Sequence, residues 1–287
     1  VNAVRQQFSR PNLFIVFPEP VIGIWFHVNV DETGPVNDVI LGTRISGNSH
    51  TVGTVGSSLI PHEERATIQV EFKAISDGKT VGANGPVRIY QDNRVELRGR
   101  KRIVFDRNGL RTEPSEADAS ISSEVTGLGT TARSCLADRM IRRRASRKMN
   151  QQKEQADGIV EWRQRRQLSE KLDQNVDARV ADGNVQWNQS VLFPLLRHDL
   201  FPRQLETRTN EDRLTALAQF ASPGQLGANA DPPPVASPND MTLQIHESAA
   251  ENVMASLLAG RRKSIGEITE SLTEHMGSPG ASKPSRS

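Results

Sequence analysis

Cysteine, aromatic residues and long apolar runs are all scarce in this chain of 287 residues. The single cysteine, Cys135, excludes an internal disulfide and a zinc site built from several thiolates. No run reaches the roughly eighteen apolar residues that a membrane-spanning helix requires, and the nearest one, residues 13–30, is interrupted by two prolines, a glutamate and a glycine. Aromatic residues make up only 5% of the chain. This is low for a compact enzyme, so Val, Ile, Leu and Ala have to supply most of any core.

Recognisable catalytic and metal-binding patterns are also missing. The six histidines lack the i, i+4 pair of a helical zinc site, and no serine occupies a nucleophile elbow. The segment GLGTTA at residues 127–132 formally matches a dinucleotide-binding turn. That turn needs a compact strand-helix-strand unit, whereas the helix expected after it is far too long. We therefore expect no enzyme, no catalytic residue, no metal and no cofactor, and interpret the glycines as a hinge.

Two-residue alternation of apolar and polar side chains dominates the first part of the chain. It is clearest at residues 66–74 and recurs at residues 39–45, 87–105 and 117–125. Residues 13–17 and 21–30 also have the composition of strands. We expect turns at Asp77-Gly78, Asn84-Gly85-Pro86 and Asn108-Gly109, and an end to the last strand at Gly127 and Gly129. The pattern predicts an antiparallel meander with one buried face.

Helical spacing replaces the alternation between residues 131 and 200, where Pro194 is the only proline. Leu168, Leu172, Val176 and Val180 define a narrow apolar stripe in this segment. A continuous helix of this length would extend on the order of 100 Å. It must lie along a sheet, pair with another helix or project as an arm. We expect bends or breaks at Gly158 and at Asp182-Gly183.

The two-residue period returns after the helix. Residues 205–220 predict a hairpin, residues 222–240 an irregular proline-rich loop, and residues 241–245 a short strand. Ser248 and Glu251 form a capping box that opens a helix ending at Gly260, and Ser264 with Glu267 opens a last short one.

These patterns predict an α+β fold in which an antiparallel, twisted sheet packs along one long helix and a C-terminal strand-helix element completes the domain. The expected organisation is a polar lead-in at 1–12, a single domain at 13–276 and a disordered tail at 277–287. Within the domain we expect a β arm at 13–126, the long helix at 131–200, and a hairpin with the strand-helix tail at 204–276.

The net charge of +2 conceals an excess of basic residues on the long helix. Such a block favours binding to nucleic acid or to an anionic surface, although charge runs are usually solvated helix faces. Trp162 is the only aromatic residue near it, so base stacking has little support, and we do not expect nucleic acid to be the main partner. Alternation on the sheet predicts a second cationic face. The candidate anion-binding residues are Arg98, Arg100, Arg102, Arg142, Arg143, Arg144, Arg147 and Lys148.

Two resemblances add to these patterns. Residues 80–89 (TVGANGPVRI), 101–110 (KRIVFDRNGL) and 243–252 (LQIHESAAEN) resemble segments of an uncharacterised family of bacterial exported proteins. That resemblance would cover about residues 39–260, and it implies an exported, periplasmic or cell-envelope location but no activity. Residues 243–258 are also similar to the strand-then-helix element of tubular lipid-binding (BPI-like) domains. In those domains a sheet rolls around a long helix and encloses acyl chains.

These features together predict a non-catalytic envelope or extracellular module with a structural or interaction role, and a protein or a lipid as its partner. Binding of a lipid or another apolar ligand in a tube of sheet and helix is the first alternative. Binding of nucleic acid or an anionic surface through the basic helix is the second. The chain begins with Val1 rather than Met, which we interpret as a removed leader or a piece of a longer protein.

Overall fold

The computed structural model of the chain describes residues 6–131, 135–222, 224–235 and 240–258. The elements follow in this order: β1 (Leu13–Pro18), α2 (Glu19–Phe26), β2 (Val28–Ile40), β3 (Thr43–Ile60), β4 (Ala66–Asn84), β5 (Val87–Asp106), β6 (Gly109–Thr112), β7 (Glu116–Thr130), α3 (Cys135–Trp187), the π-helical turn η1 (Asn188–Leu192), α4 (Phe193–Arg197), β8 (Gln204–Thr209), β9 (Arg213–Gln219), β10 (Thr242–Ile245) and α5 (Glu247–Leu258). The predicted α+β class, with one long helix and a C-terminal strand and helix, is confirmed.

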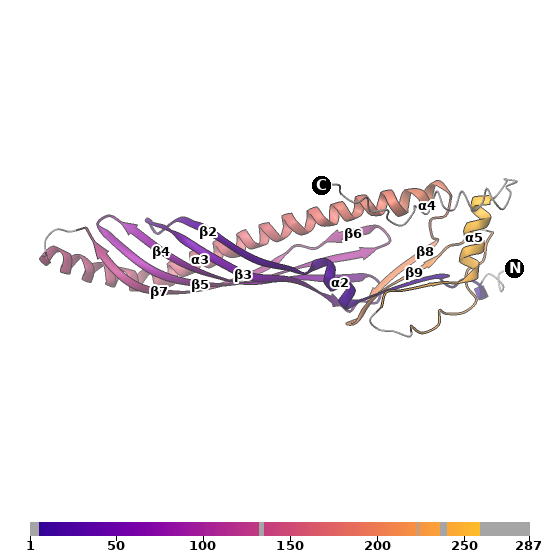
Figure 1. Ribbon diagram of the computed structural model, residues 1–287, viewed down its shortest axis with the longest axis horizontal. Helices are drawn as coiled ribbons and strands as arrows, with labels where there is room; N and C mark the ends of the chain where they lie inside the picture. Colours follow the sequence, from indigo (N-terminus) through magenta and orange to yellow (C-terminus); the bar gives the residue numbers. More distant parts are fainter. Residues whose placement is uncertain (1–5, 132–134, 223, 236–239, 259–287) are drawn as a thin grey trace, which may run out of the picture.

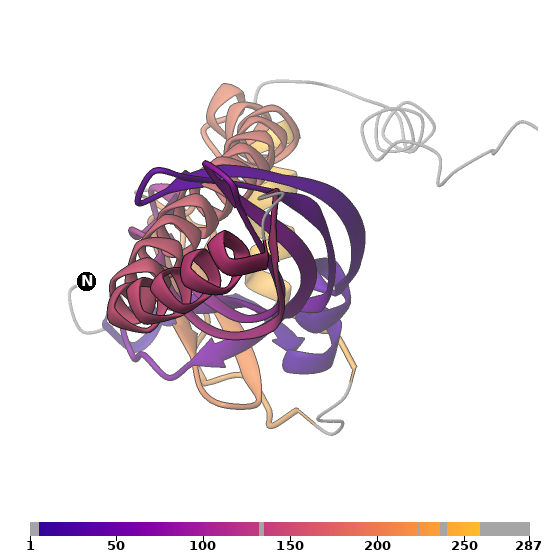
Figure 2. The same cartoon turned by 90° about the vertical axis from the view of Figure 1, so that its left-hand side faces the viewer.

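The strands form two antiparallel sheets. The larger sheet has the order β2-β3-β4-β5-β6, and β7 pairs with β5 on the same side as β6. Its long strands curl, so that one face is concave and α3 runs along the open side of the curl (Figures 1 and 2). The smaller sheet has the order β10-β1-β9-β8 and lies at the end of the molecule where α5 is found (Figure 1). This layout gives α3 a sheet to cover for most of its length.

The C-terminal half of α3 packs tightly on the concave face. Leu168, Leu172, Val176 and Val180 are each at most 8% exposed, which confirms the predicted apolar stripe. Val176 and Val180 share one core cluster with Ile22 of α2 and with residues of β3, β4, β5 and β9. Together, α2 and the smaller sheet fill this end of the curl.

Contacts near Trp187 fix the far end of α3 against β5 and β6. The rings of Phe105 and Trp187 meet edge to face with centroids 5.5 Å apart. The Asn184 side-chain amide accepts a hydrogen bond from Leu110 N at 2.9 Å and donates one to Leu110 O at 2.7 Å. These directed contacts set the position of α3 along the sheet.

Three local predictions within the β arm are wrong. Most of residues 21–30 is helical, because α2 begins at Glu19 with an acid and Pro20 in its first turn, where both are favourable. Asp77-Gly78 lies inside β4, which is paired without interruption to β3 and β5. Gly127 and Gly129 likewise lie inside β7, opposite Tyr90 and Arg88 of β5. Long-range pairing has overridden the turn preference of glycine at these positions.

The expected breaks in the long helix are also absent, since α3 continues through Gly158 and Asp182-Gly183. The irregularity comes later, at η1, where Phe193 N bonds to Asn188 O across five residues. Pro194 follows immediately in α4. A proline lacks the N–H and its ring crowds the preceding turn, so a wider π-helical turn accommodates it.

The predicted hairpin and short strand are found as β8, β9 and β10. Helix α5 begins at Glu247, one residue before the predicted capping residue, because His246 performs the capping. Its Nδ1 accepts the Ser248 N–H at 3.2 Å. The predicted helix after Ser264 and the tail at 277–287 lie outside the described residues, as does the first part of the lead-in.

Candidate functional site

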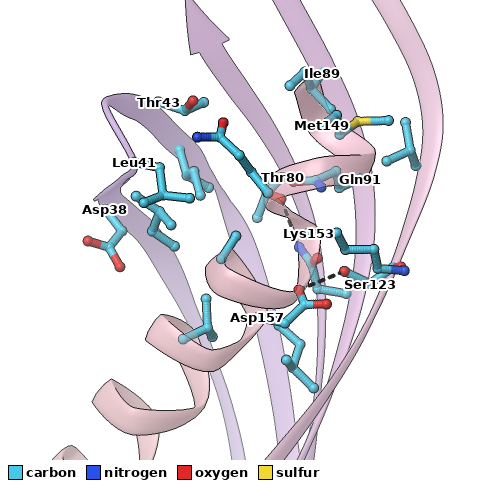
Figure 3. Close-up of a pocket in the computed structure, with 18 of the residues that line it drawn as sticks. Asp38, Leu41, Thr43, Thr80, Ile89, Gln91, Ser123, Met149, Lys153 and Asp157 are labelled. Carbon is cyan, nitrogen blue, oxygen red and sulfur yellow. Dashed lines mark hydrogen bonds between the residues drawn. The ribbon is translucent and has the colours of Figure 1, made fainter. Parts of the chain in front are cut away.

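A cavity of about 550 Å³ lies between the concave face of the larger sheet and the N-terminal half of α3 (Figure 3). Five strands contribute to its walls, namely β2, β3, β4, β5 and β7, and α3 supplies the remaining wall through residues 145–164. The second half of the long helix is therefore packed solidly on the concave face, whereas the cavity separates its first half from the middle of that face.

Apolar side chains make up much of the cavity wall. From the sheet come Ile45, Ile89, Val95, Ile121 and Val125, and the turn between β2 and β3 adds Leu41. From α3 come Ala145, Met149, Ala156 and Val160, at the four- and seven-residue spacing that places them on one helix face. An apolar molecule would meet carbon on both sides of this space.

Small residues explain why the space is open. On the sheet, Ser49, Ser76 and Gly78 lie on the wall, while Ala145 and Ala156 occupy positions on α3 that Leu168 and Leu172 occupy further along. A Leu bridges the gap between helix and sheet, whereas an Ala or Ser side chain leaves it unfilled.

A band of polar groups crosses the middle of the cavity. Asn93 donates to Thr80 Oγ1 at 2.8 Å. The Ser123 hydroxyl donates to Asp157 Oδ1 at 3.0 Å, and Lys153 donates to Ser123 O at 3.0 Å (Figure 3). These groups are paired with one another, and they present hydroxyl, amide and charged atoms to a polar portion of a ligand.

Polar side chains of α3 bond the free edge of β7 and seal one side of the cavity. Glu161 Oε1 accepts Ile121 N at 3.2 Å, and Lys153 bonds Ser123 O as described. Near the end of the strand, Arg142 donates to Leu128 O at 2.5 Å. A bare strand edge is an aggregation hazard, so the polar character of α3 is explained in part by its role as a substitute strand partner.

The opposite side of the cavity is closed more loosely. Within the described part of the chain, the hydrogen bonds and ion pairs that join α3 to β2 all come from Arg163, which pairs with Asp38 and also contacts Val39 O. We call the line between α3 and β2 the seam. The ion pair between Arg163 and Asp38 crosses the seam next to the cavity, and Asp38 is itself one of the residues that line the cavity.

The predicted anion-binding residues fall into two separate groups. Arg98, Arg100 and Arg102 are exposed on the face of β5 that points away from α3, and each lies within 4 Å of an acid: Glu96 at 3.7 Å, Glu116 at 3.9 Å and Glu113 at 3.5 Å respectively. This face is therefore a mixture of both charges. Arg142, Arg143, Arg144, Arg147 and Lys148 lie in the early turns of α3, beyond the far end of the sheet's solid core.

The second basic group adjoins the cavity. Lys148 belongs to its wall, next to Ala145 and Met149. Arg142 is committed to Asp138 at 2.9 Å and to Leu128 O. Sequence reasoning identified these residues, and its first alternative was a ligand enclosed between sheet and helix, but it did not name the residues that line the cavity. The one sequence signal for the cavity is the run of Gly and Ser in β3 and β4, which marks small side chains without saying whether they pack closely.

The sequence matches no family model, and a search of curated proteins finds no significant relative. Among the described residues, no helix is both long and apolar enough to cross a bilayer. The geometry of the cavity is therefore the basis on which a function can be argued.

Proposed function

We propose that this protein binds an elongated amphiphilic molecule, such as one with a single acyl chain, in the cavity between the sheet and α3. The observation that carries the proposal is the cavity volume of about 550 Å³ between apolar residues of both elements. Ligand pockets typically measure about 300–1,000 Å³ and combine apolar walls with a few polar groups.

The distribution of polarity supports an amphiphile rather than a pure hydrocarbon. Ile45, Ile89 and Met149 line one part of the cavity, and the polar band of Thr80, Asn93 and Lys153 crosses it further along. A purely apolar ligand would leave water trapped against these polar groups or strip it away at a cost. A ligand with a polar group can bond to them while its chain contacts the apolar wall.

The arrangement favours this ligand-binding alternative over a purely structural role. A helix whose only role is to support the sheet gains stability from close packing along its whole length. Here the close packing is confined to Leu168 and the residues that follow it, whereas on the N-terminal side of Leu168 the helix lines the cavity, with Ala145 and Ala156 among its wall residues. The resemblance of residues 243–258 to tubular lipid-binding domains supports the same proposal.

Filling the cavity tests the proposal. In Ala156→Trp, an indole projects from α3 into the cavity, so we expect affinity for a dansyl-labelled undecanoic acid to fall by more than about tenfold. Gln155→Trp is the matched control, because Gln155 is exposed and lies on the same helical turn outside the cavity wall. Fluorescence titration of folded protein provides the measurement.

A second substitution, on the sheet side of the cavity, shows whether weaker binding comes from the filled cavity rather than from a disturbance of α3 alone. An added Cβ at Gly78 would meet its nearest atoms at 3.5 Å, which is ordinary contact, so Gly78→Val should fold and narrow the cavity. Weaker probe binding in both cavity variants, with Gln155→Trp unchanged, supports the proposal. Equal affinity in all three variants and the wild type contradicts it, as does wild-type protein that binds no probe.

A further inference from the structure

Unpaired positive charge is concentrated at one end of α3. We define the basic tip as Arg139, Arg143, Arg144, Arg147 and Lys148, all of which are exposed. None of these five forms an ion pair with another described residue, and the single acid in this stretch, Asp138, is paired with Arg142. The basic tip therefore presents its charge to the surroundings.

Most of the remaining basic residues of the long helix have a partner among the described residues. Lys153 and Arg163 bond to the sheet, and Arg165 and Arg166 pair with Glu161 and Glu170 on the helix itself. Lys171 and Arg179 are exposed as well and form no ion pair with another described residue, but they stand singly along the helix. The basic tip differs from them because its five unpaired basic residues lie close together, between positions 139 and 148.

The basic tip lies where the cavity ends. Lys148 is part of the cavity wall, and Arg144 and Arg147 flank the wall residue Ala145 within one turn. Figure 1 shows these first turns of α3 at one extremity of the elongated molecule, at the end opposite α5. Met140 adds an apolar side chain that is 75% exposed beside the arginines.

We propose that the basic tip docks this end of the molecule on an anionic lipid bilayer, which gives the cavity direct contact with a source of amphiphiles. This inference rests on the proposed ligand-binding function. Each Lys or Arg held near an anionic bilayer strengthens the attraction, and an exposed Met can enter the interfacial region among the headgroups. A bilayer fits better than nucleic acid, because residues 139–148 contain no aromatic side chain for stacking on bases.

Vesicle co-sedimentation of the full chain tests the docking. We expect the wild type to bind vesicles of phosphatidylcholine with about 30% phosphatidylglycerol but not vesicles of pure phosphatidylcholine. Added salt should weaken the binding to the anionic vesicles, because it screens the charges. Arg143→Ser/Arg144→Ser/Arg147→Ser should weaken binding on the order of 100-fold, since each basic residue near the surface contributes roughly fivefold. The matched control is Arg98→Ser/Arg100→Ser/Arg102→Ser, which removes the same charge from the far face of β5.

The outcomes separate docking from ligand binding. Ala156→Trp leaves the basic tip intact, so it should bind vesicles like the wild type even though it has lost the fatty-acid probe. Equal binding to both kinds of vesicle, or equal losses in the two triple-Ser variants, overturns the docking proposal. The ligand-binding proposal for the cavity is unaffected by either result. Tighter salt-dependent binding to single-stranded DNA than to the anionic vesicles also overturns it, in favour of nucleic acid.

Discussion

Lys101 and Asp173 form an ion pair between the concave face of the sheet and α3, with 2.6 Å between Nζ and Oδ1. The same ammonium lies 2.8 Å from Asp177 Oδ1, one helical turn further along. Burial by itself lowers the pKa of Lys101, but the hydrogen bonds to Asp173 and Asp177 outweigh burial and hold that pKa above its usual value. The ammonium therefore remains charged, and it fixes which turn of α3 faces β5.

The two partners of this ion pair are buried to different extents, which predicts unequal mutational effects. The Lys101 side chain is 2% exposed, while those of Asp173 and Asp177 are 40% and 49% exposed. In Asp173→Asn/Asp177→Asn, a buried ammonium loses its counterions, and we expect the free energy of unfolding to fall on the order of 3 kcal/mol. In Lys101→Met, the two carboxylates can hydrate, so the loss should be smaller. Urea denaturation measures both, and a larger loss in Lys101→Met would rule out this explanation.

Asp177 should also make stability depend on pH in the acid range. Burial raises the pKa of its carboxyl, but hydrogen bonds from Lys101 and Thr112 and the charge of Lys101 outweigh burial, so the pKa is lowered. A lowered pKa stabilises the fold above the unfolded-state value of about 3.9, and this contribution is lost as the pH falls through the folded-state value. Between about pH 4 and pH 2, the free energy of unfolding should therefore fall more steeply in the wild type than in Asp177→Asn. Parallel slopes in urea titrations would assign the acid sensitivity to other carboxylates.

Gly99 allows α3 to approach β5 closely. A Cβ at this position would lie 2.4 Å from Leu172 Cδ1, so Gly99→Ala forces Leu172 or the helix to move. We expect a loss of about 1–3 kcal/mol in the free energy of unfolding, as for other overpacked cores. Gly99→Ala/Leu172→Ala removes the clash, so its stability should exceed the value expected if the two single losses added. Strict additivity in thermal or urea unfolding would show that the two residues are not in conflict.

The sequence predicted the features that a single element determines by itself. Leu168 to Val180 repeat every four residues because one helix face is buried. The alternation at residues 66–74 predicted a strand correctly but not its burial, because Thr67 and Gln69 on the polar face are buried as well. Predictions failed where distant residues decide the conformation. Asp77-Gly78 favours a turn locally, yet pairing with both β3 and β5 keeps it extended.

The cavity could not be predicted because missing side-chain volume has no periodic signature. Ser49, Gly78 and Ala156 are equally compatible with two backbones in close contact and with an open space between them. Which of these holds depends on the curl of the sheet and on the course of α3 along it. The basic residues were visible in the sequence, but their position at the end of the cavity depends on the same two features.

Arg163 and Asp38 hold the seam between α3 and β2, and their ion pair should control how fast a ligand leaves the cavity. The two side chains are 37% and 35% exposed, and partly exposed ion pairs contribute up to about 1 kcal/mol. Arg163→Ala should therefore speed dissociation of the dansyl probe by up to about fivefold, as measured by stopped-flow displacement. Arg163→Asp/Asp38→Arg reverses the pair and should return the rate toward the wild-type value.

Arg166→Ala is the control, because it removes an ion pair with Glu170 on the same helix without contacting β2. If Arg163→Ala and Arg166→Ala release the probe at the same rate, the ligand does not leave through the seam, and the end of the cavity beside Lys148 becomes the expected route.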